Sequence, residues 1–179
     1  MTRAQLEHII RACATITEDD DLVIIGSQSI LGEFPDAPSE LLISDEADVF
    51  PRNYPDRWEL IDGSIGELSP FHQTFGYYAQ GVSEQTATLP RGWDRRLIPV
   101  RNRRTRGATG WCLEIHDLLV SKYVANREKD RDFVRAAIRH GLVNREILSE
   151  RVLATSLDPR VHSMIDALLK QDYREADQA

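Results

Sequence analysis

Two acidic residues alternate with apolar ones in the segment from Glu46 to Phe50. On a β-strand, residues i and i+2 point to the same face, so the carboxylates of Glu46 and Asp48 would lie side by side. Two such charges repel each other unless a cation lies between them, and Mg²⁺ often binds through one or two carboxylates plus substrate phosphates. The pattern therefore predicts a divalent metal site. The alternative is a solvated acidic edge strand, to which Asp45 adds a third charge.

A glycine and two serines follow a short apolar run, in the segment from Ile25 to Ser29. Glycine lets the backbone approach a ligand closely, and the unpaired N–H groups at the start of a helix favour a phosphate. Ser27 and Ser29 add hydroxyl donors. The segment predicts a phosphate-binding turn at Gly26 and Ser27. The alternative is a turn and a helix cap without a ligand.

A lysine, Lys122, lies in an otherwise apolar stretch of a predicted helix. Such a side chain either extends to water or reaches a negative group in a cleft. The charge run that follows contains Asp130, and its alternative interpretation is a solvated helix face with ion pairs such as Arg127 with Asp130. On an unbroken helix Lys122 and Asp130 lie about 80° apart. They would therefore meet one ligand only from a shared cleft edge, or if the helix kinks near Glu128.

Seven arginines lie between residues 91 and 106, whereas the whole chain carries a net charge of −7. They are Arg91, Arg95, Arg96, Arg101, Arg103, Arg104 and Arg106. The overall charge argues against a protein that coats nucleic acid, but a local basic patch can guide a phosphate-rich substrate. Guanidinium groups suit phosphates and single-stranded ends, so the segment Arg91–Arg106 makes tRNA or another RNA a plausible acceptor. The alternative is a disordered, solvated loop.

The composition is that of one compact globular unit, because 41% of the 179 residues are hydrophobic and 28% are charged. No apolar run approaches the roughly 20 residues that span a bilayer, and the first residues lack the apolar core of a secretory signal. The two cysteines, Cys13 and Cys112, give no disulfide framework and are expected to be buried. We therefore expect a cytoplasmic protein without membrane contact.

Apolar periodicity and breaker residues predict a small sheet followed by a helical C-terminal half. The predicted strands are 22–25, 46–50, 97–100 and 111–113, and the predicted helices are 4–17, 27–31, 57–65, 117–127, 130–140, 144–153 and 159–169. This order indicates an α/β or α+β fold. We expect residues 1–113 to form the core with its N-terminal helix, and residues 114–179 to form a helical region packed on that core in a single compact unit.

Taken together, these segments resemble the signature of the nucleotidyltransferase superfamily, in which a Gly-Ser turn at the end of a strand precedes two carboxylates alternating with apolar residues. The run from Lys122 to Asp130 is similar to the Lys–Ala–Arg–(Arg/Lys)–Asp helical motif of the AbiEii and MenT-type toxin nucleotidyltransferases. The segments 61–71, 89–93 and 116–118 resemble a bacterial family of small nucleotidyltransferase-like proteins. The resemblance covers residues 22 to 153 and implies a small mixed sheet of the nucleotidyltransferase type.

The resemblance also implies a role for each chemistry-bearing residue. The turn would contact phosphates, the carboxylate pair would hold Mg²⁺ or Mn²⁺, the lysine would meet the triphosphate, and the later aspartate would complete the site. The residues assigned in this way to catalysis and nucleotide binding are Gly26, Ser27, Ser29, Glu46, Asp48, Lys122 and Asp130.

The implied activity is transfer of a nucleotide from a nucleoside triphosphate to a hydroxyl group on RNA, protein or a small molecule. A toxin-like enzyme that acts on tRNA and is held inactive by an antitoxin partner is one form of this expectation. The alternative is a catalytically inactive protein of the same fold, which binds nucleotide or serves as one half of a toxin–antitoxin pair. The presence of Glu46, Asp48 and Lys122 favours the enzyme.

Overall fold

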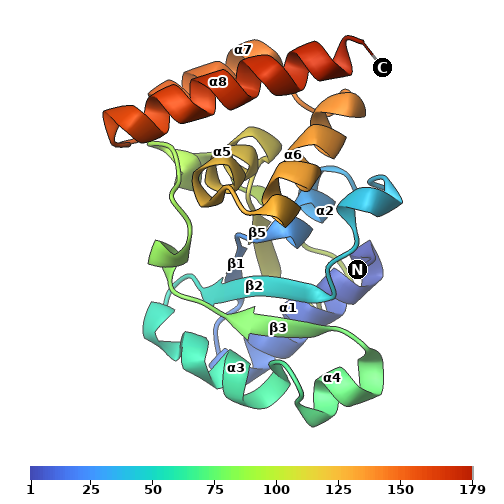
Figure 1. Ribbon diagram of the computed structural model, residues 1–179. Coiled ribbons are helices and arrows are strands. Elements are labelled where there is room, and N and C mark those ends of the chain that lie inside the picture. Colours follow the sequence, from blue (N-terminus) through green and yellow to red (C-terminus); the bar gives the residue numbers. More distant parts are fainter. Residues whose placement is uncertain (179) are drawn as a thin grey trace. The chain divides into compact units, whose positions relative to one another are not determined.

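The computed structural model describes residues 1–178, which form a mixed five-stranded sheet and a set of helices (Figure 1). The strands lie in the order β3-β2-β1-β5-β4. Strand β1 is antiparallel to β2 and parallel to β5, β2 is parallel to β3, and β4 is antiparallel to β5. The strand bounds are β1 Asp21–Ile24, β2 Glu46–Pro51, β3 Tyr78–Gly81, β4 Ile98–Val100 and β5 Thr109–Cys112. The expectation of a small mixed sheet in an α/β fold is confirmed.

The helices follow the predicted order, with two elements that the sequence pattern did not predict. Their bounds are α1 Arg3–Thr17, α2 Ile30–Glu33, α3 Trp58–Ile65, α4 Pro70–Phe75, α5 Ile115–Ala125, α6 Glu128–Arg139, α7 Arg145–Leu153 and α8 Pro159–Ala176. Short 3-10 turns cover 27–29, 39–41, 55–57, 84–86 and 93–95. The unpredicted elements are α4 and β3, and α8 continues beyond the expected end at residue 169. No helix in the described part of the chain has both the length and the apolar character that a membrane span requires.

The backbone divides into two compact units, and neither is one continuous segment. The first consists of Met1–Ala87 and Arg96–Glu114. The second consists of Thr88–Arg95 and the chain from Ile115 on. The segment 88–95 thus belongs with the C-terminal helices, although it lies within the range 1–113 expected for the core. The packing of the helical region on the core stays a prediction.

In the first unit, two helices cover one face of the sheet and leave the acidic residues of β2 on the other. Leu6, Ile9 and Ile10 of α1 are fully buried, as their helical spacing predicts. A β-carbon at Gly110 of β5 would lie 2.3 Å from Ile10, and one at Gly81 of β3 would lie 2.0 Å from a backbone oxygen of α3. The strand register places Gly110 and Gly81 on the face that carries Ala47 and Val49. Residues 46 and 48 therefore point to the opposite face.

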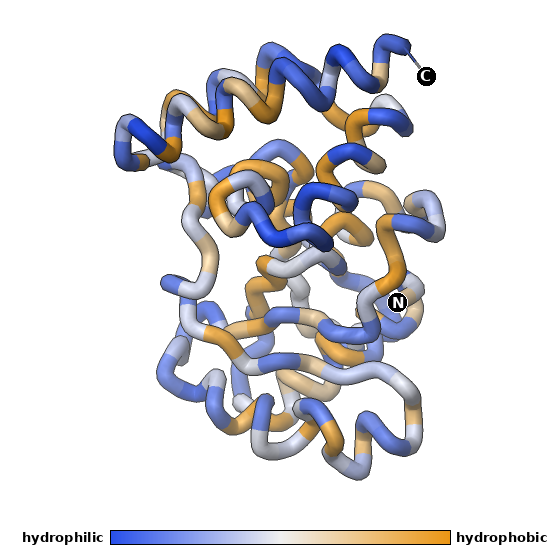
Figure 2. Tube along the Cα trace, in the orientation of Figure 1, coloured by the Kyte–Doolittle hydropathy of each residue, from blue (hydrophilic) through white to orange (hydrophobic). Residues whose placement is uncertain are grey.

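In the second unit, α5 is the central helix, and α6, α7 and α8 contact it. Its residues Leu118, Leu119 and Val120 are fully buried although they are consecutive, because a helix surrounded by neighbours is apolar on all sides. Helices α6 and α8 are amphipathic, and Figure 2 shows apolar and hydrophilic stretches alternating along α8. The Tyr123 hydroxyl of α5 donates to Asp172 of α8 at 3.0 Å, which fixes how these two helices lie against each other.

Candidate functional site

Glu46 and Asp48 lie on β2, where the strand ladder holds their backbone. Ile24 pairs with Val49, and the Ile25 amide donates to the Asp48 carbonyl at 3.1 Å. Val49 is fully buried, whereas the side chains of Glu46 and Asp48 are half-buried. The two carboxylates therefore share one face of the sheet and keep access to solvent.

Asp48 lies directly against Gly26, at the end of the neighbouring strand. A β-carbon at Gly26 would lie 1.7 Å from Asp48 Oδ2, so no other residue fits there while the carboxylate keeps its position. The backbone of Gly26, with φ −80° and ψ −171°, is one that any residue adopts, so glycine is needed for space rather than for conformation. The Gly26-Ser27 turn and the Asp48 carboxylate thus form one structural feature, although Gly26 follows β1 and Asp48 lies within β2.

The turn after Gly26 is tighter than the expected helix start. Residues Ser27–Ser29 form a 3-10 turn, which the Ser29 amide closes by donating to the Gly26 carbonyl at 2.9 Å. Gln28 and Ser29 are fully buried, and neither the Gln28 amide group nor the Ser29 hydroxyl has a hydrogen-bond partner within residues 1–178. The contact of Ser29 with a phosphate stays a prediction.

Strand β3 adds two side chains to the carboxylate face that the sequence pattern did not predict. Tyr78 lies opposite Glu46, and Gln80 lies opposite Asp48. The Tyr78 hydroxyl donates to Glu46 Oε2 at 3.1 Å, and the Gln80 amide donates to Asp62 Oδ1 at 2.8 Å. Burial alternates from Tyr77 to Gly81 in the structure, but the sequence of this four-residue strand is too short to show that period.

The carboxylate face is electronegative. Burial raises the pKa of Tyr78, and the negative charge of Glu46, its hydrogen bond to Tyr78 and the charges of Glu67 and Asp48 raise it further. Tyr78 therefore stays a neutral donor at physiological pH. The charges of Glu46, Asp48 and Glu67 are all negative, so they would attract a cation to this face.

The residues at this face suit a hard divalent cation. Two carboxylates on one face supply oxygen ligands, and the space beside Gly26 that a β-carbon would fill is taken by an Asp48 oxygen. Across the described residues, no group of three or more His, Cys, Asp or Glu side chains is arranged to hold a metal ion. The pair would thus supply only part of a coordination shell, as in sites that Mg²⁺ completes with water and substrate phosphates.

Lys122 and Asp130 meet across a break between two helices of the second unit. Helix α5 ends at Ala125, Asn126 has a left-handed φ of 48°, and α6 begins at Glu128. Lys122 Nζ lies 2.9 Å from Asp130 Oδ1. The kink near Glu128, one of the two arrangements that would let these residues meet one ligand, is therefore present.

Asp130 is the centre of a buried cluster of charges. Its carboxylate is fully buried, and it also accepts a bond from Arg127 Nε at 2.6 Å. Burial acts to raise the pKa of Asp130, but hydrogen bonds from Arg127 and Lys122 outweigh it and hold the pKa below its usual value. The alternative ion pair of Arg127 with Asp130 is thus present together with the Lys122 pair. The approach of either residue to Glu46 and Asp48 stays a prediction.

The arginine-rich segment does not form a single loop. Arg91 and Arg95 belong to the second unit, whereas Arg96 and the remaining four belong to the first, on either side of β4. The second part is ordered, because Arg11 donates to the Arg104 carbonyl at 2.9 Å and the Arg104 side chain lies 3.8 Å from Glu7. Contacts to α1 thus hold this part at Arg104, and its arginines at 101, 103, 104 and 106 are exposed, as the alternative of a solvated loop expects.

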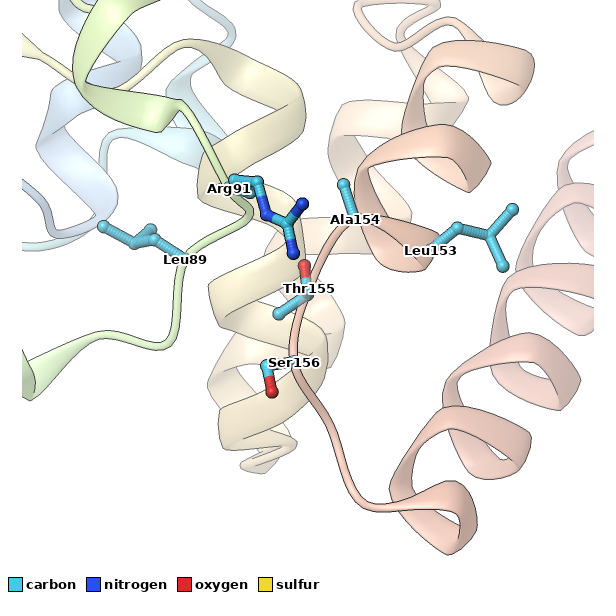
Figure 3. Close-up of a pocket in the computed structure, with 6 residues that line it drawn as sticks. All are labelled: Leu89, Arg91, Leu153, Ala154, Thr155 and Ser156. Carbon is cyan, nitrogen blue, oxygen red and sulfur yellow. The ribbon is translucent and has the colours of Figure 1, made fainter.

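A surface pocket of about 440 Å³ lies in the second unit (Figure 3). The backbone amide of Arg91 donates to the Ala154 carbonyl at 3.1 Å and so joins the two chain segments that form it. Its lining residues are Leu89, Arg91, Leu153, Ala154, Thr155 and Ser156. The pocket contains none of the predicted catalytic residues.

Comparison with known proteins identifies one family. Residues 4–175 match the model of a family described as nucleotidyltransferase of unknown function (DUF6036). No curated protein and no solved structure was found to match the chain. The match extends over almost the whole chain, including both units and every residue predicted for the site. The chain therefore belongs to this family of nucleotidyltransferases.

Proposed function

We propose that the protein transfers a nucleotide from a nucleoside triphosphate to a hydroxyl acceptor, with a divalent metal held by Glu46 and Asp48. The observation that carries the proposal is the Asp48 carboxylate lying against Gly26, with Glu46 on the same face of β2. This geometry brings the two halves of the sequence signature together. Membership of a nucleotidyltransferase family supports the reaction class and a nucleoside triphosphate as substrate.

In the first unit, the carboxylate pair would bind the metal and the turn after β1 would bind the phosphates. Glu46 and Asp48 would hold Mg²⁺ or Mn²⁺, and the cation would neutralise negative charge on the phosphates. Gly26 leaves the backbone open beside Asp48, so the turn through Ser27 could approach a phosphate closely. Most of the rate enhancement would come from positioning and electrostatics, because the pair and the turn are held by the sheet.

Lys122 and Asp130 have a proposed role in the same reaction. Asp130 holds Lys122 and Arg127 together at the start of α6. Arg127 remains 61% exposed in this arrangement, so its guanidinium keeps access to a ligand. We infer that Asp130 orients the Lys122 ammonium group toward a triphosphate and does not itself touch the substrate.

The exposed arginines of the first unit bear on the class of acceptor. RNA, including tRNA, is supported by the exposed arginines at 101, 103, 104 and 106, which lie in the same unit as the carboxylate pair. Regulation by an antitoxin partner is supported only by the resemblance of the Lys122–Asp130 segment to toxin enzymes. A nucleotide-binding protein without turnover is the competing proposal.

The test is incubation of the purified chain with Mg²⁺ or Mn²⁺, each α-labelled nucleoside triphosphate and total tRNA. We expect label to enter RNA, protein or a small acceptor. Asp48→Asn should reduce incorporation at least about 100-fold, a loss of the size seen when one electrostatic contact to a transition state is removed. The matched control is Asp45→Asn, because Asp45 is exposed and precedes the strand.

The outcomes separate the competing proposals. Incorporation by the native chain and by Asp45→Asn, with loss in Asp48→Asn, supports the enzyme. Nucleotide binding that depends on Asp48 without incorporation into any acceptor would favour the binding protein. Nucleotide binding that is unchanged in Glu46→Ala and Asp48→Ala, again without incorporation, would contradict the enzyme and show that nucleotide binding does not depend on the carboxylate pair.

A further inference from the structure

Strand β3 supplies the carboxylate pair with neutral neighbours. Its parallel register places Tyr78 opposite Glu46 and Gln80 opposite Asp48. Gln80 turns its amide to Asp62 at 2.8 Å. Tyr78 is therefore the residue of β3 whose polar group reaches the carboxylate pair.

The bond from Tyr78 engages one oxygen of Glu46 and leaves the other available. The Tyr78 hydroxyl donates to Glu46 Oε2 at 3.1 Å. Within residues 1–178 this is the one hydrogen bond made to the Glu46 carboxylate, and Glu46 forms no ion pair there. A donor on one oxygen restricts the rotation of the carboxylate, so it also restricts the direction of the second oxygen.

Glu46 depends on such a bond more than Asp48 does. Asp48 has a short side chain that is confined against Gly26. Glu46 has one more rotatable bond and is half-buried, so its free carboxylate would populate several rotamers. Holding it in one rotamer removes an entropic cost that a cation would otherwise have to overcome.

The Tyr78 ring is itself braced by α4. The ring centroids of Tyr78 and His72 lie 4.6 Å apart. His72 Nδ1 accepts a bond from the Leu68 amide at 3.0 Å, and the His72 amide donates to Ser69 Oγ at 3.1 Å. A chain of contacts thus runs from the cap of α4 to the carboxylate, and it includes both elements that the sequence pattern did not predict.

We propose that Tyr78 is a positioning residue, which acts through Glu46 to hold the carboxylate pair in the arrangement that binds a divalent cation. The inference rests on the proposed function, because it takes this pair as the metal site. Partners that orient metal-ligating side chains typically contribute about 10- to 100-fold to metal affinity. Loss of the Tyr78 hydroxyl should therefore weaken cation binding by about that factor.

The experiment is titration of the full chain with Mn²⁺ in the absence of nucleotide, following free Mn²⁺ by electron paramagnetic resonance. Tyr78→Phe should raise the dissociation constant about 10- to 100-fold. The matched control is Tyr77→Phe, since the Tyr77 hydroxyl lies 2.7 Å from His8 Nδ1 rather than near a carboxylate. It should leave Mn²⁺ affinity unchanged.

A double-mutant cycle shows whether Tyr78 acts through Glu46. In a Glu46→Gln background, Tyr78→Phe should cause no further loss of Mn²⁺ affinity, because the carboxylate that it orients is gone. Should Tyr78→Phe fail to fold in a thermal melt, His72→Leu keeps the hydroxyl but removes the bracing ring. The His72→Leu variant should also raise the dissociation constant for Mn²⁺, as Tyr78→Phe does.

Three results would overturn the proposal: native affinity in Tyr78→Phe, additive losses in the double variant, or no Mn²⁺ binding by the native chain. The proposed function can fail separately. A chain that binds Mn²⁺ with the expected differences but transfers no nucleotide would contradict nucleotidyl transfer and leave the role of Tyr78 intact.

Discussion

The contact between Gly26 and Asp48 leads us to predict the effect of adding a single methyl group at Gly26. In Gly26→Ala the new β-carbon would collide with Asp48 Oδ2, which lies 1.7 Å from that position, so the carboxylate must rotate away. We expect the free energy of unfolding to fall by about 1–3 kcal/mol, the usual cost of overpacking, together with a loss of Mn²⁺ affinity. Urea denaturation and Mn²⁺ titration measure the two effects.

Two controls isolate that collision. In an Asp48→Ala background the same glycine substitution should cost much less stability, because its collision partner is absent. Gly63→Ala, at a helical position of α3 with nothing within 4 Å, should instead stabilise the protein by about 0.5–1 kcal/mol. Equal losses for Gly26→Ala in both backgrounds would contradict the assigned contact.

At the scale of residues, the sequence predicted what depends on local spacing. The shared face of Glu46 and Asp48 follows from the two-residue period of a strand. Tyr78 could not be predicted in this way, because its bond to Glu46 depends on the pairing of β3 with β2 across more than 30 residues of chain. The close approach of Asp48 to Gly26 depends likewise on the register between β1 and β2.

The break between α5 and α6 gives a prediction about how two helices are joined. Asp130 at the start of α6 binds Lys122 of α5, and its carboxylate is fully buried. In Asp130→Asn the buried Lys122 ammonium group would lose the negative charge that lies 2.9 Å from it, so the free energy of unfolding should fall by about 3–5 kcal/mol. Asp132→Asn, an exposed carboxylate in the same helix, should change it by less than about 0.5 kcal/mol. Similar losses in both variants would show that the pair does not join the helices.

Elements with a strong period were predicted well, and those that depend on neighbours were not. The apolar spacing of α1 and α6 marks a long buried face, so their positions could be predicted to within a few residues. Strand β3 has four residues and α4 has six, too few to show a period. They form because β2 pairs with one and Ser69 caps the other.

At the scale of the whole molecule, each unit has a buried aspartate that should make stability fall in acid. Burial acts to raise the pKa of Asp19, but bonds from the Asp21, Asn53 and Tyr54 amides and from the Asn53 side chain outweigh it and lower the pKa. The pKa of Asp130 is lowered as well. A lowered pKa stabilises the fold above the unfolded value of about 3.9, and this stabilisation is lost as the pH falls through the folded pKa.

The unfolding free energy should therefore fall as the pH is lowered from about 5 toward 3. Urea denaturation across that range measures the slope. The single variants Asp19→Asn and Asp130→Asn should each be less stable at neutral pH and lose less on acidification. If the unfolding free energy of either variant falls with pH as steeply as that of the native chain, the replaced aspartate does not cause this pH dependence.

The charge distribution gives a test of the acceptor class, because a chain with net charge −7 can attract RNA only through a local patch. Arg101 and Arg103 are exposed in the first unit, and Arg160 and Arg174 are exposed on α8. Replacing either pair by Gln changes the net charge equally. If RNA is the acceptor, only the first double variant should weaken tRNA binding, and the slope of log K against log salt should become shallower by about 0.7 per lost phosphate contact. A salt slope that is the same in both variants would remove this patch as an RNA site and favour a small-molecule or protein hydroxyl.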